Sequence, residues 1–178
     1  MTLSFDYLSE ETYWETENFD CGEETVNEFL KDRDEALEYQ KHNSAITRLY
    51  YDSENNMIGF YTVQVSLLDI DRQSIKNLDW NKKLPRLKSS FPVIHVLYFG
   101  VDSRHARKGY GRQMMRDIFD MAFELVRNMG CNFIFAEAIK SENTLKFYTE
   151  LDFREIDEDD STLSTTRMVF KIDMPAKE

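Results

Sequence analysis

Residues 92–112 read PVIHVLYFGVDSRHARKGYGR, and this stretch decides the fold. Its first ten residues are almost wholly apolar, which predicts a strand covered on both faces at the centre of a sheet. Residues 111–129 then repeat an apolar side chain every three or four positions until Gly130. That period predicts a long amphipathic helix that ends at the glycine. The stretch is therefore expected to form a corner in which the most buried strand leads through a loop into the most regular helix.

The loop of this corner, residues 106–111, joins two glycines to basic side chains. At a helix N-terminus several backbone N–H groups lack partners and the dipole is positive, and glycine lets a phosphate approach that backbone. Arg107, Lys108 and Arg112 add positive charge. Two glycines one residue apart also suit a tight turn with close helix packing, so the spacing alone leaves a phosphate site and a plain turn open.

The net charge of −11 is distributed unevenly along the chain. Residues 82–116 carry nine basic groups and one acidic group, whereas both flanking segments are acidic. A local positive segment suits a phosphorylated ligand, and a solvated basic loop is the alternative. The acidic remainder argues against a broad nucleic-acid footprint, because polyanions bind through clustered Lys and Arg.

The remaining sequence predicts a mixed α/β (α+β) fold. Residues 45–51 and 57–68 are β-branched and aromatic and flank turn residues, so they predict an antiparallel hairpin. The other expected strands cover residues 3–8, 131–138, 153–156 and 165–172, and the other expected helices cover residues 23–40 and 142–151. Residues 70–90 lack a regular pattern. With 178 residues and no linker or repeat, the chain is expected to form a single domain over residues 1–178.

Composition also limits where the protein works. No stretch reaches the roughly 20 apolar residues of a membrane helix, and residues 1–15 do not resemble a leader. Cys21 and Cys131 lie far apart and match no metal or redox spacing. We therefore expect a cytoplasmic protein with reduced thiols, no membrane partner and no metal.

The loop resembles the acetyl-CoA-binding motif of the GNAT (Gcn5-related N-acetyltransferase) family, in which Gln or Arg is followed by two residues, Gly, one residue, and Gly or Ala. Ala106 stands here in place of Gln or Arg. The resemblance implies a GNAT fold with a mixed sheet of about six to seven strands flanked by helices. The residues that it assigns to the CoA pyrophosphate are Arg107, Lys108, Gly109, Tyr110, Gly111 and Arg112. Those that it assigns to the pantetheine arm, through backbone pairing, are Phe99, Gly100 and Val101.

Residues 143–148, NTLKFY, together with residues 151–153, are similar to the helix of the family that bears a Phe-Tyr pair. This similarity implies that Tyr148 is the general acid that protonates the CoA thiolate, for which its ordinary pKa near 10 is suitable. A core tyrosine is the alternative. Asn143 and Phe147 are carried over as cofactor contacts, although Phe147 also suits the core. Asp152 replaces the usual glycine, and we expect it to adopt the left-handed conformation.

Residues 19–22, FDCG, and residues 26–30 resemble the opening of one GNAT branch, which includes toxins that acetylate aminoacyl-tRNA. Residues 59–63, 84–85 and 92–94 resemble later parts of that branch. The similarity therefore extends from about residue 19 to residue 170.

In this family the amine attacks the thioester directly in a ternary complex, so no covalent nucleophile is expected. The oxyanion donor should be a backbone N–H between residues 98 and 100. Glu137 and His95, on the two inferred central strands, are the candidate bases that take a proton from the amine, directly or through water. A satisfied core histidine is the alternative for His95.

The motifs do not identify the acceptor of the acetyl group, and three functions are compatible with them. The leading hypothesis is acetyl transfer to a small-molecule or peptide amine, because the chain, including Asp157 to Asp160, is acidic. The alternative is a toxin that acetylates aminoacyl-tRNA, in which Lys82, Lys83, Arg86 and Lys88 extend the positive loop into a tRNA track. A non-catalytic acyl-CoA sensor is the third, prompted by Ala106. A homodimer and an antitoxin protein are the further partners that these hypotheses allow.

Overall fold

The computed structural model describes residues 3–80, 84–85, 88–156 and 162–173. Within these residues seven strands form one mixed sheet in the order β1-β2-β3-β4-β5-β7-β6. The strands are β1 (Ser4–Tyr7), β2 (Ile46–Tyr51), β3 (Met57–Asp69), β4 (Ser90–Val101), β5 (Phe133–Ile139), β6 (Arg154–Glu155) and β7 (Thr165–Lys171). The α-helices are α1 (Glu24–Lys31), α2 (Glu38–Lys41), α3 (Arg72–Asn77), α4 (Tyr110–Asn128) and α5 (Glu142–Thr149). The predicted α+β fold is confirmed, and the apolar strand of residues 92–101 is β4 at the centre of the sheet.

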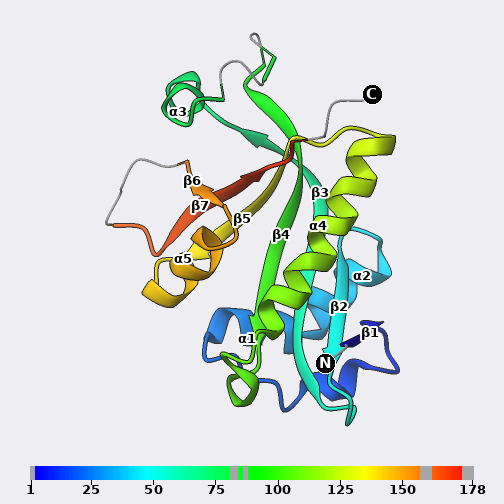
Figure 1. Ribbon diagram of the computed structural model, residues 1–178. Coiled ribbons are helices and arrows are strands. Elements are labelled where there is room, and N and C mark those ends of the chain that lie inside the picture. Colours follow the sequence, from blue (N-terminus) through cyan, green and yellow to red (C-terminus); the bar gives the residue numbers. More distant parts are fainter. Residues whose placement is uncertain (1–2, 81–83, 86–87, 157–161, 174–178) are drawn as a thin grey trace. The chain divides into compact units, whose positions relative to one another are not determined.

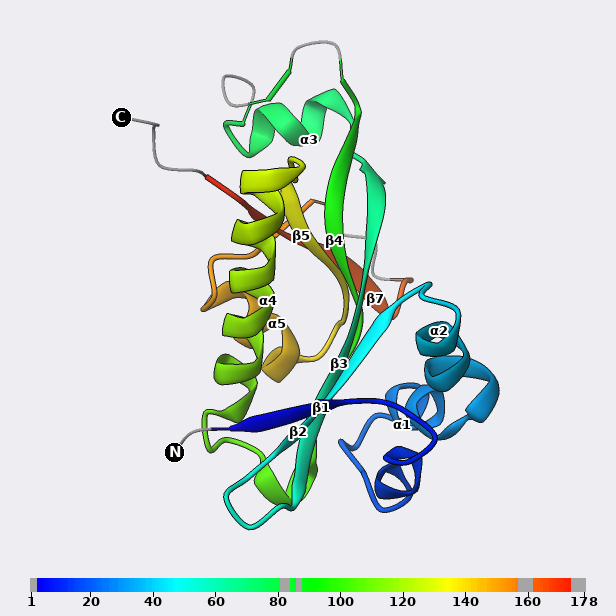
Figure 2. The same cartoon turned by 90° about the vertical axis from the view of Figure 1, so that its right-hand side faces the viewer.

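The chain forms two compact units that each combine separate stretches of sequence. Unit 1 comprises Met1–Gln64 and Val96–Asp120, and unit 2 comprises Val65–His95 and Met121–Glu178. In unit 1, α1 and α2 lie on one face of β1–β3 and the first half of α4 lies on the other (Figure 2). The predicted hairpin of residues 45–51 and 57–68 is confirmed as the antiparallel pair β2–β3.

Unit 1 is closed by an unusually close approach of β3, β4 and α4 at Gly59. A Cβ atom at Gly59 would lie 2.7 Å from the carbonyl oxygen of Gly100 and 2.9 Å from the sulfur of Met114. A Cβ atom at Gly100 would in turn lie 3.1 Å from the ring of Phe19. Phe19 also packs edge-on against Phe60, with ring centroids 5.3 Å apart. Gly59 is therefore required by packing, because a side chain there would push the helix and the strands apart, whereas a Cβ at Gly100 would require only small shifts of the neighbouring side chains.

Unit 2 has its own aromatic core. Phe133 on β5 packs against Phe91 on β4 and against Trp80, with ring centroids 5.6 and 5.2 Å apart. β5 pairs with β7 in antiparallel register, and α5 lies against β5 (Figure 1). This core holds the strand that carries Glu137 and the helix that carries Tyr148.

The predicted helix over residues 23–40 is wrong in one respect, because it is interrupted. Asp32 has extended backbone angles (φ −81°, ψ 123°), and its side chain accepts a hydrogen bond from the N–H of Asp34. α1 therefore ends at Lys31, and a π-helical turn over Arg33–Leu37 precedes α2. The apolar spacing continues through the break, which is why periodicity alone does not reveal it.

Two other expectations needed correction. Residues 70–90, expected to be irregular, contain α3, whose N-terminus is capped by Asp71 through the N–H groups of Gln73 and Ser74. Met129, expected on the apolar face of the long helix, is 82% exposed.

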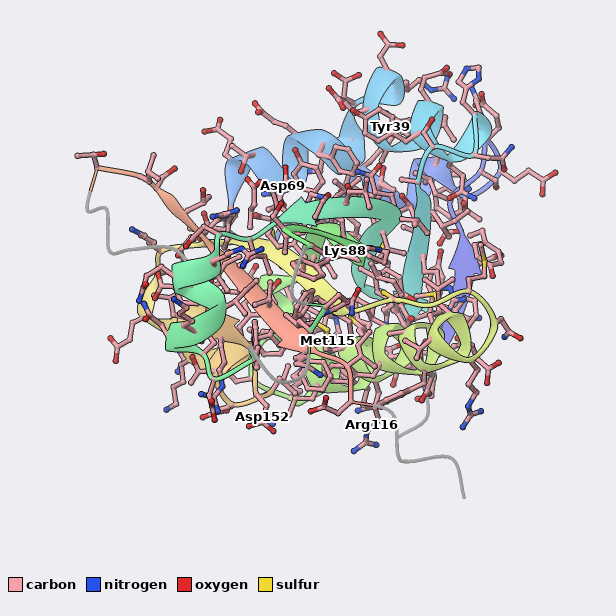
Figure 3. The ribbon with its side chains drawn as sticks, turned by 90° about the horizontal axis from the view of Figure 1, so that it is seen from above. Tyr39, Asp69, Lys88, Met115, Arg116 and Asp152 are labelled. Carbon is pink, nitrogen blue, oxygen red and sulfur yellow. The ribbon has the colours of Figure 1, made fainter. Side chains whose placement is uncertain are left out.

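The long helix itself is confirmed as α4. Met115 on its inner face is fully buried, whereas Arg116 on its outer face is exposed to solvent (Figure 3). Gly130, with φ +87°, ends the helix by donating its N–H to the carbonyl of Leu125. No helix in the described parts of the chain is both long and apolar enough to cross a bilayer.

Replacing Gly59 by alanine tests the close approach. The added methyl group meets a backbone oxygen and a buried sulfur, so Gly59→Ala should lower the free energy of unfolding by about 1–3 kcal/mol. Urea denaturation measures this change. Val65→Ala on the same strand is the control, because Val65 is 71% exposed and its truncation should change stability by less than about 0.5 kcal/mol. Equal effects of the two substitutions would show that the glycine is not required by packing.

Candidate active site

The predicted phosphate loop has a backbone that only a few residue types accept. β4 ends at Val101, a 3-10 turn covers Ser103–His105, and α4 begins at Tyr110. Between them Arg107 has φ +60° and Gly109 has φ +83°. The left-handed conformation is free for glycine but costs about 1–2 kcal/mol for a residue such as arginine. Strain of this kind is found at binding sites, where left-handed turns aim backbone N–H groups at an anion.

The loop has both the space and the charge to hold a diphosphate. Apart from the chain neighbours of Gly109, no atom of the described residues lies within 4 Å of the place where its Cβ would be, so an anion can approach the backbone there. Arg107, Lys108 and Arg112 are exposed around it. The loop also opens the 19-residue helix α4, whose dipole adds positive potential at that end. These residues fit the pyrophosphate of acetyl-CoA.

A wide hollow of about 1240 Å³ adjoins β4 at Tyr98 and is here called the acidic pocket. The ring of Tyr98 stacks on Phe29 of α1 with centroids 3.7 Å apart and an interplanar angle of 12°. Five carboxylates and two basic groups line the hollow. The carboxylates are those of Asp20, Glu24, Glu28, Asp32 and Glu35, and the basic groups are those of Lys31 and Arg33. Because Arg33 is paired with Glu10, the potential in the pocket favours a cation.

Sequence reasoning missed the acidic pocket. The signal that could have found the pocket is the recurrence of carboxylates at Glu24, Glu28 and Glu35, but only the interrupted helix brings them to one hollow.

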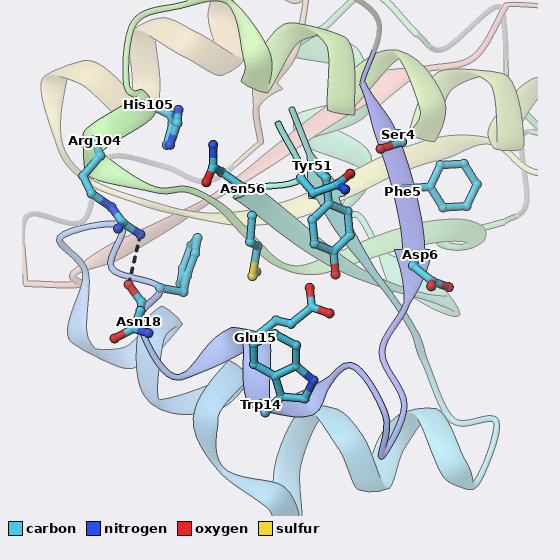
Figure 4. Close-up of a pocket in the computed structure, with 13 residues that line it drawn as sticks. Ser4, Phe5, Asp6, Trp14, Glu15, Asn18, Tyr51, Asn56, Arg104 and His105 are labelled. Atoms are coloured by element: carbon cyan, nitrogen blue, oxygen red, sulfur yellow. Dashed lines mark hydrogen bonds between the residues drawn. The ribbon is translucent and has the colours of Figure 1, made fainter. Parts of the chain in front are cut away.

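A second hollow of about 650 Å³ lies elsewhere in unit 1, between β1, the β2–β3 turn and the loop after β4. Tyr51 points into it toward the carboxylate of Glu15, and Trp14 forms part of its wall (Figure 4). Burial, together with the Glu15 carboxylate, raises the pKa of Tyr51. None of the residues predicted to bind the cofactor lines this hollow.

Tyr148 lies in unit 2, on the buried side of α5. Its residue is 6% exposed, and its ring meets Phe147 and Phe153 edge-on with centroids 5.4 and 5.1 Å away. Burial raises the pKa of Tyr148, so the hydroxyl stays protonated at neutral pH. Asp152 after the helix has φ +63°, which confirms the expected left-handed turn. Asn143, on the first turn of α5, is exposed.

The two candidate bases lie together in unit 2. His95 on β4 is half-buried and packs on Phe135, with ring centroids 4.5 Å apart. Burial lowers the pKa of His95, while the nearby carboxylate of Glu137 acts in the opposite direction. The imidazole is therefore largely neutral at pH 7 and can accept a proton. Glu137 is exposed and faces Arg167 across the β5–β7 pair.

The structure thus gathers the predicted residues in two groups. Phe99, Gly100 and Val101 at the end of β4 lie in unit 1 with the loop of residues 107–112, and Asn143, Phe147, Tyr148 and Glu137 lie in unit 2.

Most of the predicted tRNA track falls outside the described residues. Lys88 is exposed on the segment before β4 (Figure 3). Lys82, Lys83 and Arg86 lie outside the described residues, as does the acidic stretch from Asp157 to Asp160.

Comparison with known families gives one match. The model of the acetyltransferase (GNAT) family matches residues 9–153, which include the loop, both candidate bases and Tyr148. No curated protein sequence matches the chain.

Several solved structures share the fold. AtaT complexed with acetyl-methionyl-tRNAfMet has a TM-score of 0.76 and 19% identity, with 96% of this chain and 95% of that chain covered. A mutant of KacT has a TM-score of 0.78 and 18% identity, with 96% and 95% covered. AtaTR bound with AcCoA has a TM-score of 0.71 and 20% identity, with 95% and 93% covered. At these identities the likeness establishes the fold.

The loop can be tested with two glycines that share a backbone conformation. Gly109→Val should weaken binding of coenzyme A at least about tenfold, because a branched side chain would occupy the space left for the phosphate. Isothermal titration calorimetry measures the affinity. Gly130→Val is the matched control, since Gly130 has φ +87° and nothing within 4 Å of its Cβ position, yet lies after α4. Both variants should lose similar stability, and an equal loss of affinity in the two would remove the loop from the site.

Proposed function

The chain belongs to the acetyltransferase (GNAT) family and is an N-acetyltransferase that uses acetyl-CoA, and from this premise we propose that its acceptor is the α-amino group of an aminoacyl-tRNA. The single observation that carries the cofactor assignment is the loop after β4. There, two left-handed residues and the start of α4 face open space among exposed basic side chains.

In the proposed mechanism the amine attacks the thioester carbonyl and the C–S bond breaks. A backbone N–H between residues 98 and 100 stabilises the oxyanion. Tyr148 gives its proton to the leaving thiolate, and its raised pKa keeps that proton available at neutral pH. His95 or Glu137 takes the proton lost by the amine. The demand on this base is modest, because an α-amine with a pKa near 8 is already partly neutral.

Two observations support the tRNA acceptor. Solved structures of the fold include AtaT complexed with acetyl-methionyl-tRNAfMet, and residues 19–22 and 26–30 resemble the same branch. In addition, four basic side chains are exposed around the start of α4. They are Arg107, Lys108, Arg112 and Arg116. They would meet the phosphates of an acceptor stem as well as those of the cofactor.

The acidic pocket favours a second candidate, a small cationic or peptide amine. Its five carboxylates lie beside Tyr98, next to the segment of β4 proposed to hold the pantetheine arm. Such a surface attracts ammonium groups and repels phosphodiesters. The two candidates therefore differ in which charged surface meets the acceptor.

Thiol release from acetyl-CoA separates these candidates. With aminoacyl-tRNA as acceptor, release is expected and should fall steeply between 50 and 200 mM salt, because each neutralised phosphate adds to the salt dependence. Spermidine and a peptide with a basic N-terminus are the comparison acceptors. Release with these amines alone would establish the second candidate. Tight acetyl-CoA binding without release from any acceptor would instead identify a sensor.

An antitoxin protein and a homodimer belong to this proposal as partners. In a solved structure of the same fold, a mutant AtaT toxin is bound to the C-terminus of the antitoxin AtaR.

Tyr148→Phe tests the general acid. Turnover should fall at least about tenfold while the affinity for acetyl-CoA stays within about twofold, because the hydroxyl acts mainly in the transition state. Steady-state kinetics and calorimetry give the two values. Tyr61→Phe is the control, since Tyr61 is also a buried tyrosine but belongs to unit 1, whereas Tyr148 belongs to unit 2. Unchanged turnover in Tyr148→Phe would remove the assignment.

A further inference from the structure

A fully buried carboxylate stands at the point where β4 becomes the cofactor loop. Asp102 is 0% exposed and follows the last residue of β4. Its carboxylate accepts four hydrogen bonds. They come from the backbone N–H of Asp20 (3.2 Å), the backbone N–H of Arg104 (2.9 Å), and the Nε and one terminal nitrogen of Arg104 (2.8 Å each). A carboxylate without solvent is stable only when it is satisfied in this way.

These bonds fasten the loop to a distant segment of the chain. Arg104 also donates to the carbonyl of Asn18 at 3.2 Å, drawn as the dashed line in Figure 4. Ser103 donates twice to the carbonyl of Asp20, from its N–H at 2.8 Å and from its hydroxyl at 2.9 Å. Ser103 and Arg104, the two residues that follow Asp102, are thus both hydrogen-bonded to residues 18–20.

The fastened segment is also a wall of the acidic pocket. Asp20 and Gly22 line that pocket, and the Asp20 side chain accepts from the N–H of Gly22 and from Asn27, both at 2.8 Å. One hydrogen-bonded chain therefore runs from the acidic pocket through Asp20 and Asp102 to the residues that precede Arg107.

A local capping role explains only part of this arrangement. Capping the 3-10 turn of Ser103–His105 requires a single bond, the one from the N–H of Arg104. The bond from Asp20 and the two-pronged bond from the Arg104 side chain connect elements that the cap does not need. Such a fork fixes orientation as well as distance.

We propose that Asp102 is a positioning residue, which holds the cofactor loop and the wall of the acidic pocket in one arrangement so that acetyl-CoA and the acceptor bind in register. The proposal rests on the proposed function for the assignment of the loop to acetyl-CoA, and it takes the acidic pocket as the surface that attracts the cationic amine of the acceptor. Asp102 does not touch the reacting atoms. It acts through Arg104 and Asp20.

The charge of Asp102 is maintained by its partners. Burial raises the pKa of Asp102, but the hydrogen bonds from Arg104 and from the N–H of Asp20 outweigh burial and hold the pKa below its usual value. Because the folded-state pKa is depressed, the stability that this pairing contributes is present above about pH 4 and is lost as the pH falls through the folded-state pKa.

Asp102→Asn is the principal test. Asparagine keeps the size but offers one acceptor oxygen and no charge, so the fork and the bond from Asp20 cannot both be kept. The affinity for acetyl-CoA should fall about tenfold and the KM of the acceptor should rise about tenfold, while kcat stays within about threefold of the wild-type value. Asp117→Asn is the matched control, because Asp117 on α4 also holds a tyrosine and an arginine, Tyr50 and Arg48, but touches neither the loop nor the pocket.

A second variant separates positioning from charge. Arg104→Lys keeps the positive charge but cannot form the fork, so it should also weaken acetyl-CoA binding, by about threefold or more. Arg104 is an exposed side chain, so this variant should fold even if Asp102→Asn does not.

The outcomes are distinct. If both variants lower the melting temperature but bind acetyl-CoA and acceptor as the wild type does, Asp102 is structural only and the proposal is overturned. Calorimetry with acetyl-CoA applies to the proposal even when no acceptor is turned over. If the wild-type protein turns over no acceptor, the proposed function is overturned, but the proposed role of Asp102 is still tested by acetyl-CoA binding.

Discussion

The rest of the structure depends on the close approach of three backbone segments at Gly59. With no side chain there, the backbone carbonyl of Gly100 and the side-chain sulfur of Met114 come within 3 Å of the Cβ position, so α4 packs through Met114 directly onto the backbone of β3 and β4. This contact fixes where α4 starts relative to the end of β4. The space left for the loop between them is short, and the chain crosses it with left-handed backbone at Arg107 and Gly109. The geometry that suits a diphosphate is therefore a consequence of packing in the core of unit 1.

Unit 1 carries opposite charges on two neighbouring surfaces. Basic side chains surround the start of α4, and carboxylates line the pocket beside Tyr98. An enzyme that brings an anionic cofactor to an amine benefits from such a separation, because each partner is attracted to its own surface and repelled by the other. An aminoacyl-tRNA combines a cationic amine with an anionic stem, so each of these two surfaces would attract one part of it and repel the other.

The groups proposed to transfer protons have different environments. Tyr148 is buried against aromatic rings and keeps its proton, whereas His95 is held neutral by burial and lies close to the carboxylate of Glu137. Environments that separate the proton affinities of nearby groups are typical of acid and base pairs in enzymes. Cys21 and Cys131 are both free thiols, and the proposed direct attack of the amine gives neither a catalytic role.

The sequence by itself determined the elements whose signal is local. The apolar run of residues 92–101, the period of α4, the turn at Asp152 and the loop glycines follow from side-chain pattern and backbone preference, and all are found as expected. Only the tertiary structure decided features that join distant residues. The acidic pocket and the bond from the N–H of Asp20 to Asp102 depend on contacts between segments as much as 82 residues apart. Periodicity reports which face of one element is apolar, but it carries no information about which other segment will satisfy a buried carboxylate.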